Sequence, residues 1–142
     1  MALRSFNPTL WASAFWWGSL TAVGFGVVPM LFANLPTPAA AGAMAAKLFS
    51  ALTWVTVACG LILLSSLRRN GLPAQSNQAQ TALVFIVLGM LLALLSEFAV
   101  APRIVARENL RLWHSVGTLM YVVQWACASI TLVKVNAGQR TD

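Results

Sequence analysis

The sequence predicts an all-α membrane protein, a four-transmembrane-helix bundle, and three observations predict it. Of 142 residues, 59% are hydrophobic and only 8% are charged, whereas soluble domains carry about a quarter charged residues. The apolar residues gather in four runs of about 20 residues, the length that crosses a hydrocarbon core of about 30 Å. The runs lack the alternation of barrel strands, and only helices or closed barrels satisfy their backbone groups in lipid.

The four spans are placed where these apolar runs begin and end. The first run competes with a signal peptide, but the apolar region of a signal peptide is only about 7–15 residues long. We therefore read it as a true span and treat residues 1–142 as a single membrane domain. The predicted spans are residues 10–31, 44–67, 81–101 and 113–133.

Breakers and polar residues define the connections. Residues 68–80 are expected to form a polar loop, because they contain Gly71 and Pro73 as breakers. Pro102 ends the third span or starts the next helix. Residues 134–142 are expected to form a polar tail.

The net charge of +6 predicts membrane flanks rather than nucleic-acid binding, because the basic residues stand between apolar runs instead of forming one patch. With four spans, both termini and the central loop share one side of the membrane. That side holds Arg4, Arg68, Arg69, Lys134 and Arg140, and the other holds Lys47, Arg103, Arg107 and Arg111. The positive-inside rule then favours both termini in the cytoplasm, by five residues to four, and we expect the membrane to be the inner (cytoplasmic) one.

Small residues recur at every fourth position of the first span. Ala14, Gly18, Ala22 and Gly26 form a stripe of the small-xxx-small kind, against which a neighbouring helix can pack closely. The alternative is that small residues are simply common in membrane helices. Pro29 is expected to kink the end of this span, because proline removes a helical hydrogen bond.

The fourth span carries a stripe of small and polar residues at helical spacing. We expect this stripe to face the bundle interior, where hydrogen bonds across helices are available. It can line a polar path or fasten helices together. Its members are Gly117, Tyr121, Gln124, Ala128 and Thr131.

The connection between the third and fourth spans is predicted to be a short amphipathic basic segment. Arg103, Arg107, Arg111 and His114 recur at i, i+4, i+8 and i+11, so on a helix they share one face. A helix lying at the membrane surface, or the fourth span extended into water, gives this pattern.

A polar cluster is predicted on the same side of the membrane. Glu97 lies about one turn before the predicted end of the third span, and an ionised carboxylate in a membrane helix usually has a partner. The candidate partners are Arg103, Arg107, His114 and Lys47. The alternatives are a structural pin for Glu97, snorkelling for Lys47 and a solvated histidine.

The sequence contains no signature of a conventional enzyme. No GxSxG, HExxH or Gly-rich phosphate loop occurs, and only three residues are acidic. Cys59 and Cys127 lie inside apolar runs and are expected to be small packing residues. His114 is the only histidine, which argues against a closed zinc site. We therefore expect no catalytic residue, no metal site and no cofactor.

Several short stretches together form a recognisable pattern. They are residues 15–19, 28–32, 41–42 and 47–49, with Glu97, Pro102, Arg107 and residues 112–115 later in the chain. This pattern resembles a bacterial domain-of-unknown-function family, DUF4149, which is related to eukaryotic transmembrane protein 205. The resemblance implies a four-helix membrane bundle and supplies no reaction. More distantly, the layout resembles copper-resistance membrane proteins of the CopD kind, which implies transport or metal handling.

Two main functions remain open at this stage, and a metal or haem site that uses His114 is a third option. The first is a non-enzymatic membrane accessory or interaction module, whose partners are the lipid bilayer and a second copy of the chain or another membrane protein. The second is a small transporter or carrier of a ligand or ion, a metal included, that uses Glu97 and His114. Such a carrier would respond to pH, because imidazole changes its charge near neutral pH.

Overall fold

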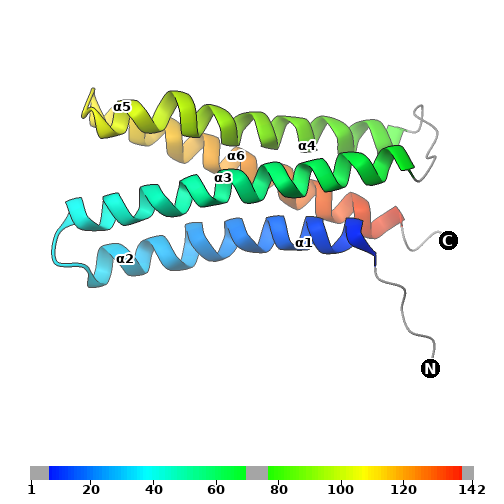
Figure 1. The fold of residues 1–142 in the computed structure, drawn as a ribbon, viewed down its shortest axis with the longest axis horizontal. Coiled ribbons are helices and arrows are strands. Elements are labelled where there is room, and N and C mark those ends of the chain that lie inside the picture. Colours follow the sequence, from blue (N-terminus) through cyan, green and yellow to red (C-terminus); the bar gives the residue numbers. More distant parts are fainter. Residues whose placement is uncertain (1–6, 70–76, 139–142) are drawn as a thin grey trace.

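The computed structural model describes residues 7–69 and 77–138, which form long helices joined by short connections (Figure 1). Four helices are long and apolar enough to cross a membrane, and each extends beyond its predicted span at both ends. They are Pro8–Asn34, Pro38–Arg68, Ala79–Val105 and Leu110–Ala137. The described residues contain no strand. The predicted fold class, an all-α four-helix membrane bundle, is confirmed.

Two of the four spans contain a short π-helix. The first span is α1 (Pro8–Thr21), η1 (Ala22–Val27) and α2 (Val28–Asn34), and the second is α3 (Pro38–Arg69). The third is α4 (Asn77–Leu95), η2 (Ser96–Val100) and α5 (Ala101–Val105), and the fourth is α6 (Leu110–Gly138). Residues 68–69 and 77–80 of the predicted polar loop therefore belong to α3 and α4, and residues 134–138 of the predicted polar tail belong to α6. Residues 70–76 and 139–142 of those segments lie outside the described part.

A proline explains each π-helix. In η1 the N–H of Val28 bonds to the carbonyl of Val23, and in η2 the N–H of Ala101 bonds to the carbonyl of Ser96. The next residue is Pro29 in the first case and Pro102 in the second. Proline has no N–H and clashes with the carbonyl four residues earlier, so a widened turn lets the helix continue past it. Pro102 is the second residue of α5, and the third span runs past it to Val105, so the predicted helix boundary at Pro102 is wrong.

The spans form a closed ring in which each packs against two neighbours. α1 packs against α3 and α6, and α4 packs against the same two helices. The start of α1 and the end of α6 lie at one end of the bundle, and α2 and α5 lie at the other (Figure 1). We call the second the α2–α5 end.

The interior of the bundle is built mostly from small residues, and large apolar residues cover its outside. Phe15, Met30, Phe98 and Leu119 are more than 60% exposed, as suits side chains that face lipid. Helices in lipid associate through close packing of small residues. The small buried apolar residues are Ala12, Ala41, Ala45, Cys59, Ala82, Ala93, Cys127 and Ala128. The two cysteines are thus small core residues, as predicted.

Three glycines mark the closest approaches between side chains and helices. A Cβ atom at Gly89 would overlap the indole of Trp16, and one at Gly24 would overlap the ring of Tyr121. A Cβ atom at Gly60 would overlap the side chain of Met90. These glycines are therefore required by packing.

The predicted small-residue stripe of the first span takes no part in these close contacts. A Cβ atom at Gly18 or Gly26 would meet nothing within 4 Å, and Ala22 is exposed. The stripe does not hold the described spans of this chain together. Contact with a second copy or another protein stays a prediction.

The connection between the third and fourth spans differs from the predicted amphipathic segment. Arg103 lies on α5, Arg107 lies in a turn, and Arg111 lies in the first turn of α6. Arg107 and Asn109 have positive φ angles of 56° and 37°, a conformation that breaks a right-handed helix. The arginines therefore do not share one helix face. Periodicity alone missed this turn.

Candidate functional site

A cavity of about 380 Å³ lies between the spans toward the α2–α5 end. All four spans line it, and both π-helices contribute residues to its wall: Gly24 and Phe25 from η1, and Ser96, Glu97 and Val100 from η2. π-helical turns occur frequently at functional sites. The rest of the wall is mainly apolar.

The seven polar side chains in the wall come from three helical segments. Thr53 belongs to α3, and Ser96 and Glu97 belong to η2. The remaining four belong to α6: His114, Thr118, Tyr121 and Gln124. A mainly apolar pocket with a few placed polar groups is the usual form of a small-molecule site.

Glu97 is half-buried and reaches across to α3. The hydroxyl of Ser50 donates a 2.5 Å hydrogen bond to its Oε1. The helix continues for eight residues beyond Glu97, to Val105, which is about 12 Å at 1.5 Å per residue. Glu97 therefore lies deeper than the single turn expected from the sequence, because α5 prolongs the third span past Pro102.

The second carboxylate oxygen of Glu97 has no hydrogen-bond partner among the described residues and is not fully enclosed. Within the described part of the chain, Oε2 accepts no hydrogen bond. No described side-chain nitrogen or oxygen is both fully enclosed and without a partner. Oε2 is therefore accessible, and Glu97 lines the cavity.

A hydrogen-bonded junction lies beside the cavity, toward the core. The buried hydroxyl oxygen of Thr56 accepts a 3.1 Å bond from Nε1 of Trp16 and a 3.0 Å bond from Nε2 of Gln124. This junction joins α1, α3 and α6. Trp16 also belongs to the hydrophobic core cluster, together with Leu20 and Leu63.

Tyr121 adds a second link between spans beside the cavity. Its hydroxyl donates a 2.6 Å bond to the carbonyl of Leu20, and its ring packs edge-on against Phe49 with centroids 5.3 Å apart. Tyr121 and Gln124 of the predicted α6 stripe therefore face inward and fasten helices together, which is one of the two predicted roles. Both side chains also line the cavity.

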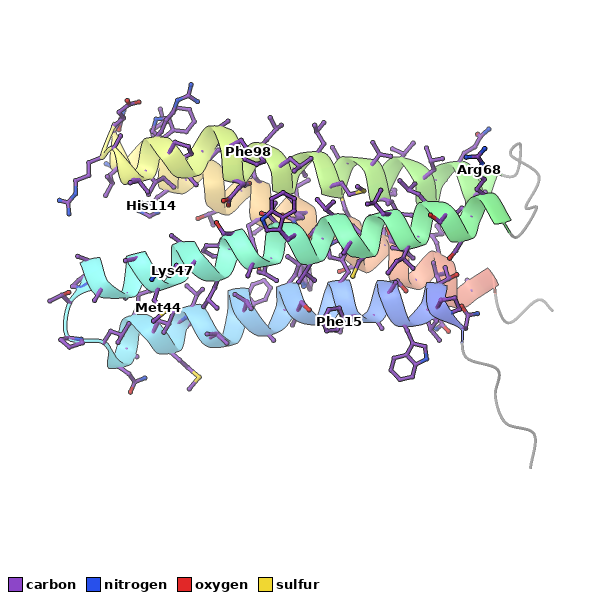
Figure 2. All side chains as sticks on the ribbon, in the orientation of Figure 1. Phe15, Met44, Lys47, Arg68, Phe98 and His114 are labelled. Carbon is purple, nitrogen blue, oxygen red and sulfur yellow. The ribbon has the colours of Figure 1, made fainter. Side chains whose placement is uncertain are left out.

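The structure brings together only part of the predicted polar cluster. Glu97 and His114 both line the cavity, whereas Arg107 and Lys47 are exposed and do not. Figure 2 shows Lys47 and His114 in the half of the bundle away from Arg68. Among the described residues no ion pair with Glu97 is present; its bond is with Ser50.

Two residues of the site escaped the sequence analysis. Ser50 and Thr56 sit in an apolar run with no motif around them, and their roles depend on partners 47 and 68 residues away. The prolines Pro29 and Pro102 were the available signal for the π-helices that shape the cavity. For metals, residues 7–69 and 77–138 contain no cluster of three His, Cys, Asp or Glu side chains.

A family model described as "Domain of unknown function (DUF4149)" matches residues 11–112, which is more than half of the chain. The chain belongs to this family. Searches of curated proteins and of solved structures found no match.

The DUF4149 match covers most of the cavity wall. It includes Glu97, Ser50 and both π-helices, and it ends two residues before His114. The polar side chains that α6 contributes to the cavity lie beyond the matched region.

Proposed function

We propose that this DUF4149 protein is a non-enzymatic membrane protein that binds a small, largely apolar molecule in the cavity between its spans, as a carrier does. The cavity itself carries the proposal. Its volume of about 380 Å³ falls within the range of about 300–1,000 Å³ typical of ligand pockets. Its wall combines apolar side chains with an open carboxylate oxygen at Glu97.

The test fills the cavity without disturbing the bundle. Gly42 lines the cavity and has nothing within 4 Å of a Cβ atom, so the side chain of Gly42→Phe can enter empty space. Gly18→Phe is the matched control, because Gly18 has the same open surroundings but does not line the cavity.

Photolabelling with a small aryl diazirine, mapped by mass spectrometry, reads out occupancy. We expect adducts on Glu97 and Tyr121 in the unaltered protein and in Gly18→Phe, and loss of those adducts in Gly42→Phe. Adducts that are absent in the unaltered protein, or unchanged by Gly42→Phe, would contradict binding in the cavity.

The accessory or interaction module is the second candidate, and one observation favours it. The small-residue stripe of the first span faces outward with open space at Gly18 and Gly26, as a helix–helix contact between chains requires. Replacing Gly18 and Ala22 with leucine should shift the oligomeric state in mild detergent, measured by light scattering. An unchanged mass would remove this candidate.

Three further assignments belong to the proposal. Kinship with transmembrane protein 205 is supported by the stretches quoted above, among them residues 28–32 and 112–115. Location in the inner membrane, with both termini in the cytoplasm, is supported by the distribution of basic residues.

A further inference from the structure

We infer that the ligand of this cavity is an organic cation, that is, a small apolar molecule that carries one positively charged nitrogen. The inference rests on the proposed function and adds the chemical class of the ligand. Three features of the cavity wall support it: its charges, the open oxygen of Glu97 and its aromatic rings.

The charges of the wall favour a cation. Of the described residues, Glu97 is the acidic one that lines the cavity, His114 is the basic one, and no lysine or arginine among them lines it. A charge in a membrane segment is costly unless it is paired, and within the described part of the chain Glu97 has a neutral hydroxyl as its partner. A cationic ligand would supply the missing opposite charge.

The geometry of the carboxylate leaves a place for that charge. The Ser50 hydroxyl bonds to Oε1, while Oε2 is not fully enclosed and Glu97 lines the cavity. The hydrogen bond from Ser50 also fixes the carboxylate toward α3, so the ligand meets an oriented acceptor. Charge-assisted contacts of this kind are stronger than neutral ones.

Aromatic rings surround the same space. Phe25, Phe32, Phe49 and Tyr121 all line the cavity. The face of an aromatic ring attracts a cation through its quadrupole, and the rings also bury the apolar part of such a ligand. The Tyr121 hydroxyl donates its proton to the backbone carbonyl of Leu20, so it has no further proton to donate to a ligand.

The basic residues of this end lie outside the cavity. Arg103 places its guanidinium 4.4 Å from the ring centroid of Trp113, and Arg107 and Lys47 are exposed. Basic residues beside a membrane attract anionic lipids, whose phosphates offset their repulsion of an approaching cation. An anionic ligand would instead be repelled by the carboxylate of Glu97 inside the cavity.

The experiment compares three probes of similar shape and different charge on the full-length protein in zwitterionic nanodiscs. Protonated N,N-dimethylbenzylamine is the cation, isobutylbenzene is its neutral isostere and phenylmethanesulfonate is the anion. Each competes with the aryl diazirine for labelling of Glu97 and Tyr121. We expect protection by the cation at concentrations at least about tenfold lower than for the other two, the ratio of a single well-placed charge contact.

Two variants with the same change in net charge separate the site from the surface. Glu97→Gln removes the carboxylate of the cavity, and Glu108→Gln removes an exposed carboxylate of the turn. Protection of Tyr121 by the cation should weaken about tenfold or more in Glu97→Gln and stay unchanged in Glu108→Gln. If the cation protects Tyr121 equally well in both variants, the proposed role of Glu97 is wrong.

The outcomes distinguish this inference from the proposed function. If the neutral or anionic probe protects the cavity as well as the cation does, the cavity binds ligands but the cationic class is overturned. If no probe protects and Gly42→Phe leaves the labelling unchanged, both the inference and the proposed function fall.

Discussion

Replacing Thr56 with valine should destabilise the bundle more than any other exchange of one buried threonine for its isostere. Thr56 is fully buried and accepts hydrogen bonds from Trp16 and Gln124. Valine keeps the shape and removes the acceptor. The N–H groups of two side chains then lose their partner; Trp16 is fully buried and Gln124 is 4% exposed.

The magnitude follows from the number of bonds. Interhelical hydrogen bonds in membranes contribute about 0.6 kcal/mol each and up to about 1.7. Two bonds give a loss of about 1–3 kcal/mol in the free energy of unfolding, toward the upper end because both donors stay buried. Titration of the protein in mixed micelles with a denaturing detergent, followed by circular dichroism, measures this loss.

Thr131→Val is the matched control. Thr131 is also fully buried, but its hydroxyl donates only to the carbonyl of Cys127 in its own helix. That carbonyl belongs to the α6 backbone, so the loss should be smaller than for Thr56→Val. Equal effects of the two substitutions would refute the three-helix junction.

Three further substitutions test local features of the fold. Gly89→Val should lower the free energy of unfolding by about 1–3 kcal/mol, because its side chain would overlap the indole of Trp16; a neutral effect in the same titration would show that the spans pack differently. Arg107→Gly should raise the midpoint of thermal unfolding slightly, because glycine adopts the positive φ of the turn without strain; a fall would argue against the turn. Trp113→Leu should cost about 0.5–1 kcal/mol through its cation–π contact with Arg103, and in a double-mutant cycle with Arg103→Gln the two effects should not add.

The fold could be predicted from the sequence because it depends on local composition. Each apolar run carries its own length and hydropathy, so the four spans follow without any knowledge of contacts. The inward stripe of α6, with Gln124 and Thr131, also follows from helical spacing within one segment.

The cavity could not be predicted in the same way, because it depends on where different helices meet. The sequence marks Glu97 and His114 as unusual, but it does not show that Ser50 bonds to Glu97 or that Arg107 lies outside. The arginine periodicity suggested one helix face, and the turn with positive φ at Arg107 and Asn109 breaks that register. The Ala14–Gly26 stripe could not be assigned for the same reason, because residue spacing identifies a packing surface but not the helix that packs against it.

The central claim is that the bundle encloses an accessible cavity at its α2–α5 end, and two adjacent positions of α6 test it most directly. Thr118 lines the cavity, while Leu119 is 65% exposed and does not line it. Cysteines are introduced singly at these positions, with Cys59 and Cys127 replaced by alanine, and reacted in proteoliposomes with a charged, water-soluble methanethiosulfonate. The structure predicts that Thr118→Cys reacts faster than Leu119→Cys, because one faces the cavity and the other faces lipid. Equal rates, or faster reaction at Leu119→Cys, would contradict the cavity.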